Sequence, residues 1–106
     1  MSAMDAKVLR RAAEIVEQGW CQGALARDER GVGVGLNSPR AAAWCAVGAF
    51  KLAMHELGCA RIPCRSWDSA EAACGGSAVR FNNAPERTAD EVAAALREAA
   101  ARCEAE

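Results

Sequence analysis

The sequence predicts a mainly α-helical domain, in which three to four helices pack into one compact unit covering residues 1–106. Apolar residues recur at helical spacing near both ends of the chain, over 4–18 and from Thr88 onward. Between them, the segment 39–57 is almost continuously apolar. With 106 residues, 52% of them hydrophobic, the chain can build one core but not two. We therefore expect a single helical domain around a central buried helix at 39–57, with a small β-hairpin over 24–36.

The first helix is expected over residues 4–18. Five apolar residues recur on one side of it: Val8, Leu9, Ala12, Ile15 and Val16. Charged residues occupy the other side, and Gly19 ends the pattern. This arrangement predicts a surface helix with one buried stripe.

A short β-hairpin is the expected structure of residues 24–36. A first strand is expected at 25–27, followed by a polar turn over 28–31 and a return strand with alternating apolar residues. The glycines at positions 33 and 35 weaken the second strand, so a loop is the alternative.

The central helix is expected to run from Pro39 to Leu57. Ser38 can cap its first turn, Pro39 suits the first helical position, and Gly58 marks its end. One face of a helix with these bounds carries Arg40, Trp44, Lys51 and His55. Charged residues interrupt the apolar run, so we expect a core helix rather than a membrane span.

Two further helices are expected after Gly58. Asp68 and Glu71 have the spacing of a capping box for a short helix that ends near Gly75. Residues 77–81 are expected to form a helical turn, with an extended segment as the alternative. Thr88 and Glu91 form a second capping box, which predicts the start of the last helix. Its buried side is expected to consist of Val92, Leu96, Ala99 and Cys103.

Charge and composition narrow the classes of function. The net charge of −1 gives no overall field that would attract nucleic acid or an anionic membrane. The N-terminal stretch lacks the apolar core of a secretory signal, so we expect a cytoplasmic protein without a membrane partner. In that compartment the six cysteines are expected to be reduced and to pack as small hydrophobic side chains. The domain is expected to fold alone or as an oligomer, without a cofactor.

Polar residues near two tryptophans are the candidate binding surface. If the hairpin folds over the central helix, these residues converge: Trp20, Gln22, Arg40, Trp44, Lys51, His55, Asn82 and Asn83. Large aromatic residues beside arginine are typical of interfaces and ligand pockets. The alternative is a structural network, in which Gln22 and the two asparagines satisfy buried loop backbone.

A cysteine nucleophile is the enzymatic alternative, with Cys21, Cys45 and His55 as its candidate residues. If Cys45 and His55 lie in one helix, ten residues separate them by about 15 Å, which is beyond hydrogen-bond reach. Cys21 with His55 remains compatible with the sequence, since a loop could cover the end of the helix. Inert packing is the common role of a buried cysteine.

A structural zinc site is a further alternative. His55, Cys59, Cys64 and Cys74 are ligand types that zinc accepts, and they follow one another around the end of the central helix. The spacing contains no C-x-x-C knuckle, so we expect no metal. A nucleic-acid-binding adaptor is a third reading, but the basic pairs occur beside acidic residues and no helix-turn-helix pattern accompanies them.

Three segments carry a likeness that spans most of the chain. They are Gly-Trp-Cys-Gln-Gly-Ala-Leu-Ala-Arg-Asp (19–28), Trp-Cys-Ala-Val-Gly-Ala (44–49) and Phe-Asn-Asn-Ala-Pro-Glu-Arg-Thr-Ala-Asp-Glu-Val (81–92). They resemble a family of small uncharacterised proteins from bacteria and phages with the motifs W-x-Q-G-A, W-C-A-x-G-A and W-N-D-A-P-G-R-T. The last motif departs at Phe81, Asn83 and Glu86, where the family has Trp, Asp and Gly. The resemblance implies a phage or mobile-element setting and supplies no mechanism.

These observations together favour a small non-enzymatic binding protein. We expect it to occupy the surface of a protein partner, and the resemblance and the small size extend this to inhibition of a host protein system. The cysteine-dependent enzyme and the nucleic-acid adaptor remain the alternatives.

Overall fold

A computed structural model describes residues 3–58 and 64–105, and in these ranges it shows five helices and two short strands. In chain order they are α1 (Ala3–Gln18), β1 (Ala26–Arg27), β2 (Ala43–Trp44), α2 (Ala46–Glu56), α3 (Cys64–Ala73), α4 (Ala78–Asn83) and α5 (Ala89–Ala105). The expected mainly helical fold with a small antiparallel sheet is confirmed.

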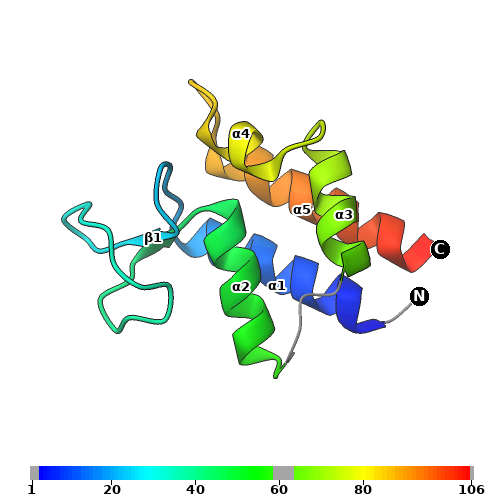
Figure 1. Ribbon diagram of the computed structural model, residues 1–106, viewed down its shortest axis with the longest axis horizontal. Helices are drawn as coiled ribbons and strands as arrows, with labels where there is room; N and C mark the ends of the chain where they lie inside the picture. The colour runs from blue at the N-terminus through cyan, green and yellow to red at the C-terminus, as the bar shows by residue number, and fades with distance from the viewer. Residues whose placement is uncertain (1–2, 59–63, 106) are drawn as a thin grey trace.

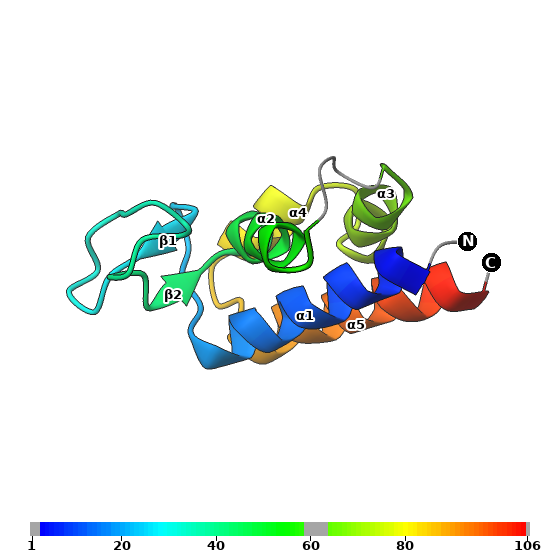
Figure 2. The ribbon, with the colours of Figure 1, turned by 90° about the horizontal axis from the view of Figure 1, so that it is seen from below.

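The helices form two layers (Figure 2). The two longest helices, α1 and α5, run side by side in opposite directions, so that both chain ends lie at the same end of the molecule (Figures 1 and 2). Helices α2, α3 and α4 lie across one side of this pair. The strands and their loops project at the opposite end. Because α1 packs against α5, α2 and α3, it is the element on which the core is assembled.

The first and last helices, α1 and α5, agree closely with the sequence prediction. The apolar stripe of α1 is buried throughout, with Leu9 and Val16 at 0% exposure. At the start of α5, Thr88 Oγ1 accepts a hydrogen bond from the Glu91 amide at 3.2 Å, while Glu91 Oε1 accepts one from the Thr88 amide at 2.9 Å. This is the expected capping box. The predicted buried side of α5 is also confirmed: Val92, Leu96, Ala99 and Cys103 are all buried.

Ion pairs hold the exposed edges of α1 and α5 together. Arg97 donates to both carboxylate oxygens of Glu17, at 2.6 and 2.7 Å, and Arg10 contacts Glu104 at 2.5 Å. The hydrogen bonds from Arg97 lower the pKa of the Glu17 carboxyl. Because these groups are exposed to water, the pairs fix the alignment of the two helices more than they add stability.

The predicted end of the central helix is confirmed, with Leu57 as the C-cap of α2 before Gly58, but its predicted start was wrong. The helix expected at 39–57 begins only at Ala46, because the preceding amides bond to other segments. The Ala42, Trp44 and Cys45 amides donate to the carbonyls of Arg27, Gly19 and Leu25. These bonds hold residues 42–45 extended, and the Cys45 thiol caps α2 by accepting the Gly48 amide at 3.3 Å.

The residues expected to open that helix form a turn instead. Ser38 Oγ accepts the Arg40 amide at 3.1 Å, and the Ser38 carbonyl accepts the Ala41 amide at 3.0 Å. A serine followed by proline can start either a helix or a turn, because its hydroxyl bonds equally well to a nearby amide in both. Arg40 and Trp44 therefore precede α2 and share no helical face with Lys51 and His55.

The strand pairing differs in part from the expected hairpin. The strand expected at 25–27 is β1, and Arg27 forms an antiparallel bridge with Gly33 across the expected turn. The ladder partner of β1, however, is β2, with Ala26 opposite Trp44 and Arg27 opposite Ala43. The segment predicted as helix thus supplies the second strand of the sheet.

Helices α3 and α4 complete the second layer. The short helix expected after Asp68 begins earlier, at Cys64, and it ends at Ala73, before Gly75 and Gly76 with their positive φ angles. Glu71 does not cap α3 as expected, because its carboxylate accepts the Ala78 amide at the start of α4. The predicted helical turn at 77–81 is confirmed as the beginning of α4, capped by Ser77.

Candidate functional site

The loop end of the molecule is held by one buried side chain, Asn82. It lies near the end of α4 and is 1% exposed. Its Oδ1 accepts hydrogen bonds from Trp20 Nε1 at 2.8 Å and from the Ala46 amide at 3.0 Å. Its Nδ2 donates to the Cys21 carbonyl at 3.1 Å and to Asn83 Oδ1 at 3.0 Å. Asn82 therefore joins α4 to the 20–22 loop and to the first amide of α2.

We call this meeting point of α4, the 20–22 loop and the start of α2 the junction. Gln22 and Arg27 extend the junction into the loop. Gln22 Nε2 donates to the carbonyls of Asn82 and Ala84, both at 3.0 Å. The Arg27 guanidinium donates to the Gln22 carbonyl, through Nη2 at 3.0 Å, and to the Gly31 carbonyl at 2.8 Å. These side chains serve backbone groups that no regular secondary structure satisfies.

Two glycines allow the backbones at the junction to touch. A Cβ added at Gly19 would lie 2.0 Å from the Ala42 carbonyl oxygen, and one added at Gly48 would lie 2.0 Å from the Leu25 carbonyl oxygen. No side chain fits at such a distance. The 19–25 loop can therefore lie directly on β2 and on the first turn of α2.

The structure brings together only part of the predicted binding surface. Trp20, Gln22, Asn82 and Asn83 meet at the junction, where Asn83 Oδ1 also accepts the Gly23 amide at 3.0 Å. The Trp44 indole instead donates to the Leu36 carbonyl at 3.0 Å. Three further predicted residues are exposed elsewhere: Arg40 on the loop, and Lys51 and His55 on α2.

The predicted cysteine and histidine residues do not form a catalytic pair. Cys45 caps the first turn of α2 and His55 lies in its last turn, so about 15 Å of helix separates them. Cys21 lies at the Cys45 end, where its carbonyl bonds to Asn82. Burial, followed by the nearby Cys45, raises the pKa of the Cys21 thiol, although Arg27 opposes this. A raised pKa keeps the thiol protonated at neutral pH.

The predicted zinc ligands are described only in part. Cys59 lies outside the described residues, and the Cys64 side chain is not described. His55 is exposed on α2, whereas Cys74 is buried beside Ala78 and Ala95, where burial raises the pKa of its thiol to about 11. Among the residues whose side chains the structure describes, no three His, Cys, Asp or Glu side chains form a group that could hold a metal ion.

An apolar hollow of about 300 Å³ lies beside the junction. It is lined by the 23–25 loop, by Cys45 and Val47 at the start of α2, and by Val79, Asn82 and Asn83 of α4. Leu25 is 41% exposed and Val79 is 52% exposed, although both are large hydrophobic residues. We call this feature the apolar hollow; its floor includes Asn82, whose side chain is fully hydrogen-bonded.

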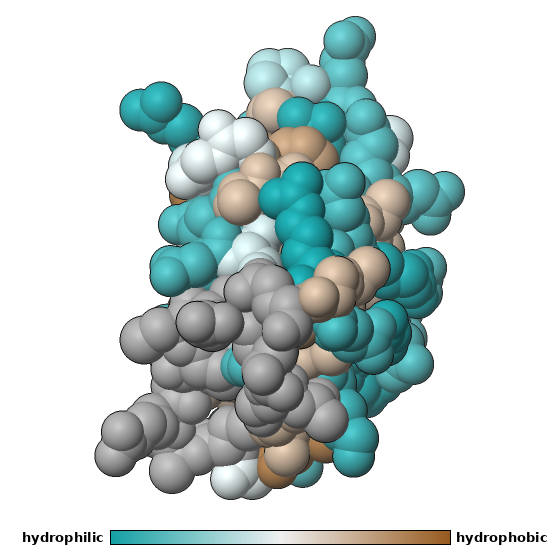
Figure 3. Space-filling model, turned by 90° about the vertical axis from the view of Figure 1, so that its right-hand side faces the viewer, coloured by the Kyte–Doolittle hydropathy of each residue, from teal (hydrophilic) through white to brown (hydrophobic). Residues whose placement is uncertain are grey.

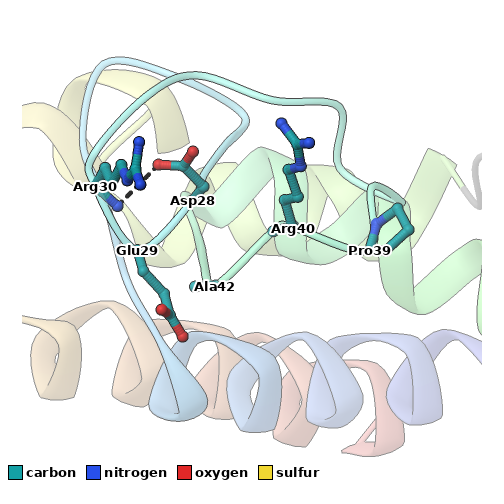
Figure 4. A pocket seen from close by; sticks show the side chains of 7 residues that line it. Asp28, Glu29, Arg30, Pro39, Arg40 and Ala42 are labelled. Carbon is teal, nitrogen blue, oxygen red and sulfur yellow. Dashed lines mark hydrogen bonds between the residues drawn. The ribbon is translucent and has the colours of Figure 1, made fainter.

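A second hollow, of about 430 Å³, is polar. It lies between the 28–30 turn and residues 39–42 (Figure 4). Asp28 Oδ1 accepts the amides of Arg30 and Val32, both at 2.9 Å, and so shapes the turn. Arg30 and Arg40 extend toward the same side as the Asp28 carboxylate, whereas Glu29 points the other way. Within the described parts of the chain, neither guanidinium has an ion-pair partner.

The end of the molecule that carries the chain termini looks different. In the view of Figure 3 the described residues are mostly hydrophilic, and apolar atoms occur only in scattered patches. Among the described residues, no helix is long and apolar enough to cross a membrane. Of the four exposed large hydrophobic side chains among the described residues, Met4 lies near the N-terminus, whereas Leu25, Val32 and Val79 belong to the 23–36 loops and to α4.

Sequence analysis did not identify Leu25, Val47 and Val79 as lining residues of a site. It also did not predict the hydrogen bonds from Arg27 and Arg87 to loop carbonyls. Leu25 and Val79 each lie among small or polar neighbours, and an isolated apolar residue gives no periodicity. Arg87 donates to the Phe81 carbonyl at 2.8 Å and stacks on the Phe81 ring at 3.6 Å from its centroid. In the sequence, the only indication of the Arg87–Phe81 contact was that Arg87 lies close to the turn that follows α4.

Comparison with known protein families gives a match over nearly the whole chain. The model of a family described as a family of unknown function, DUF6197, matches residues 1–102. The matched range includes every described element except the last residues of α5. No match was found among curated proteins or among solved structures.

Proposed function

The chain belongs to the DUF6197 family of unknown function, and from the geometry of its loop end we propose that it is a non-enzymatic domain that binds a protein partner. The observation that carries the proposal is the apolar hollow. Leu25 and Val79, two of the four most exposed large hydrophobic side chains among the described residues, lie on its rim. Exposed apolar groups gathered at one concave place are typical of interaction sites.

The size and lining of the hollow suit one apolar side chain of a partner. Full burial of a leucine or phenylalanine side chain contributes roughly 1.5–3 kcal/mol, which is the scale of an interface hot spot. Val47 and Val79 provide apolar contact from two different helices. A side chain inserted between them would be enclosed from both sides.

The junction keeps the hollow in its binding shape before a partner arrives. The hydrogen bonds of Asn82 and Gln22 fix the 20–24 loop against α2 and α4. A preformed site loses little conformational freedom on binding, so more of the contact energy appears as affinity. The predicted residues Trp20, Gln22, Asn82 and Asn83 thus support the surface from behind.

The polar hollow adds charged side chains to the proposed binding surface at the loop end of the molecule. Arg30 and Arg40 are free to pair with carboxylates of a partner. Such rim charges govern the rate and selectivity of association more than its strength. Lys51 and His55, exposed on α2, extend the polar surface.

We place this activity in the cytoplasm of a bacterium, in the phage or mobile-element setting that the sequence motifs imply. The partner is then a host protein, and occupation of its surface inhibits it. The apolar hollow, with the hydrogen-bonded Asn82 in its lining, suits a role that requires binding alone.

Matched variants test the proposal. We would immobilise the wild-type domain, Val79→Gln and Val32→Gln and capture proteins from host lysate. The two valines are exposed to a similar extent, 52% and 57%, but only Val79 lines the apolar hollow. A protein retained by wild type and Val32→Gln but lost from Val79→Gln is the expected result. Equal capture by all three, or no capture, would contradict the proposal; circular dichroism and thermal midpoints of the three proteins control for folding.

A further inference from the structure

Two cysteines far apart in sequence lie side by side at the junction. Trp20 and Trp44 form a parallel β-bridge, closed by bonds from the Trp44 amide to the Gly19 carbonyl at 3.0 Å and from the Cys21 amide to the Trp44 carbonyl at 3.2 Å. Neighbouring strands lie about 4.8 Å apart. Cys21 and Cys45 each follow the bridged residue directly, so they form the next pair in the same register.

Their side chains point to the same face. Successive residues of extended chain alternate between faces, and the two parallel segments alternate in step. The bridged tryptophans are half-buried, whereas Cys21 and Cys45 are 8% and 9% exposed. The cysteines therefore share the inner face.

The atoms around the two sulfurs also meet. Cys21 Sγ lies 3.5 Å from the Ala24 carbonyl oxygen, and Cys45 Sγ lies 3.3 Å from the Gly48 amide nitrogen. Gly48 in turn packs directly on the Leu25 carbonyl, the neighbour of Ala24. The Cys21 thiol thus lies at the Ala24 carbonyl, and the Cys45 thiol lies at Gly48, which packs on the next carbonyl of the same loop.

We propose that Cys21 and Cys45 form a dithiol site that a small disulfide oxidant converts to an intramolecular disulfide. A spacing of 4.4–6.8 Å between Cα atoms is what a disulfide needs, and adjacent parallel segments meet it. The structure describes the side chains of four cysteines, and all four are free thiols. The other two, Cys74 and Cys103, belong to other elements: Cys74 directly follows α3 and Cys103 lies on α5.

The chemistry proceeds by two exchanges. One cysteine thiolate attacks the oxidant, whose S–S bond breaks and releases one thiol, leaving a mixed disulfide on the protein. The second cysteine then attacks the protein sulfur of that mixed disulfide and releases the other thiol. The protein loses two electrons and two protons, and the oxidant is reduced to two thiols. Because burial raises the pKa of Cys21, the reaction should accelerate as the pH rises above neutral.

The disulfide would tie the whole loop end to α2. It closes the segment 21–45, which contains β1, β2 and both turns of the polar hollow. Cys45 also lines the apolar hollow, so the oxidation state bears directly on that wall. We expect the oxidised protein to unfold at a temperature at least about 5 °C higher than the reduced protein.

Tryptic mapping of the native full-length protein treated with oxidised glutathione tests the proposal. Cleavage after lysine and arginine places each of the six cysteines on its own peptide, with Cys21 on 12–27 and Cys45 on 41–51. The expected product is one linked pair, 12–27 with 41–51, lighter than the two reduced peptides by two hydrogens. Reduction should release the two peptides and remove the thermal shift.

Two single substitutions provide the matched comparison. Cys45→Ser should abolish the link while α2 keeps its cap, because serine is a strong capping residue. Cys74→Ser should leave the link intact. The proposal fails if the native protein links another cysteine pair, if a glutathione adduct persists on Cys21 or Cys45 without closing the internal disulfide, or if native thiols stay unreacted while urea-unfolded protein reacts. These outcomes do not depend on partner binding.

Discussion

Gly48→Ala should destabilise the protein, although alanine is the better helix former. Gly48 lies in the first turn of α2, where alanine would normally stabilise the helix by about 1 kcal/mol. A Cβ at this position, however, would lie 2.0 Å from the Leu25 carbonyl oxygen and 2.9 Å from its carbon, against an ordinary contact of 3.4 Å or more. Backbone, and not a flexible side chain, would have to move.

The cost of that movement can be estimated. Forcing a methyl group into a packed site costs about 1–3 kcal/mol, and more where the neighbour cannot yield. Moving the Leu25 carbonyl also weakens its bond from the Cys45 amide, worth about 1 kcal/mol. The helix gain offsets only part of this, so we expect a net loss of about 2 kcal/mol.

Urea unfolding followed by tryptophan fluorescence measures the change. Gly33→Ala is the matched control, because a Cβ at Gly33 meets nothing within 4 Å and its φ is not in the left-handed region. The control should be neutral or gain a few tenths of a kcal/mol. If Gly48→Ala is as stable as wild type or more stable, the close approach of the 23–25 loop to α2 is refuted.

Two further substitutions test the junction and the turn after α4. Asn82→Ala should cost about 3–5 kcal/mol in urea unfolding, because it leaves the half-buried Trp20 indole and the buried Ala46 amide without an acceptor; a loss below 1 kcal/mol would contradict the role of Asn82. Glu86→Gly should raise the thermal midpoint by the equivalent of about 0.5–1 kcal/mol, since Glu86 has a φ of +67° that only glycine adopts freely. Glu29→Gly, a loop glutamate without positive φ, should not stabilise, and equal effects at both positions would refute the explanation.

The parts of the fold that the sequence predicted are those with local causes. The α1 stripe and the Thr88 capping box depend on residues within one helix, so periodicity and spacing were sufficient. The start of α2 depended on distant partners. Alanines at 41–43 favour a helix in isolation, but the carbonyls of Gly19, Leu25 and Arg27 take the amides that a helix would have used.

For the candidate site, the sequence likewise indicated some of the residues but not the contacts between them. Trp20, Gln22 and the two asparagines were identified because polar groups beside a tryptophan need partners when buried. Which atoms they join could not be derived, since the contacts link α4 to segments about 60 residues away. The apolar hollow was missed for a related reason: it exists only where Leu25 and Val79, from unrelated segments, meet.

The three segments on which the sequence resemblance rests come together at Asn82. Trp20 and Gln22 belong to the first segment, the Ala46 amide to the second, and Asn82 itself to the third. These four motif residues therefore share one structural role, which is to hold the loop against α2 and α4. Glu86, where the motif has glycine, lies at the one non-glycine position with positive φ in the described chain.

If the proposed function holds, residues without such a role are the ones available to contact a partner. Val79, Arg30 and Arg40 are exposed, and their side chains have no hydrogen bond or ion pair within the described residues. Replacement of a junction residue should therefore change stability and binding together, because the hollow loses its support. Replacement of Val79, Arg30 or Arg40 should change binding while the free energy of unfolding stays within about 0.5 kcal/mol of wild type. The hydrogen bonds at Asn82 are the reason for this difference between the junction residues and the three exposed residues. Experiments that measure stability and binding separately can therefore distinguish the two groups.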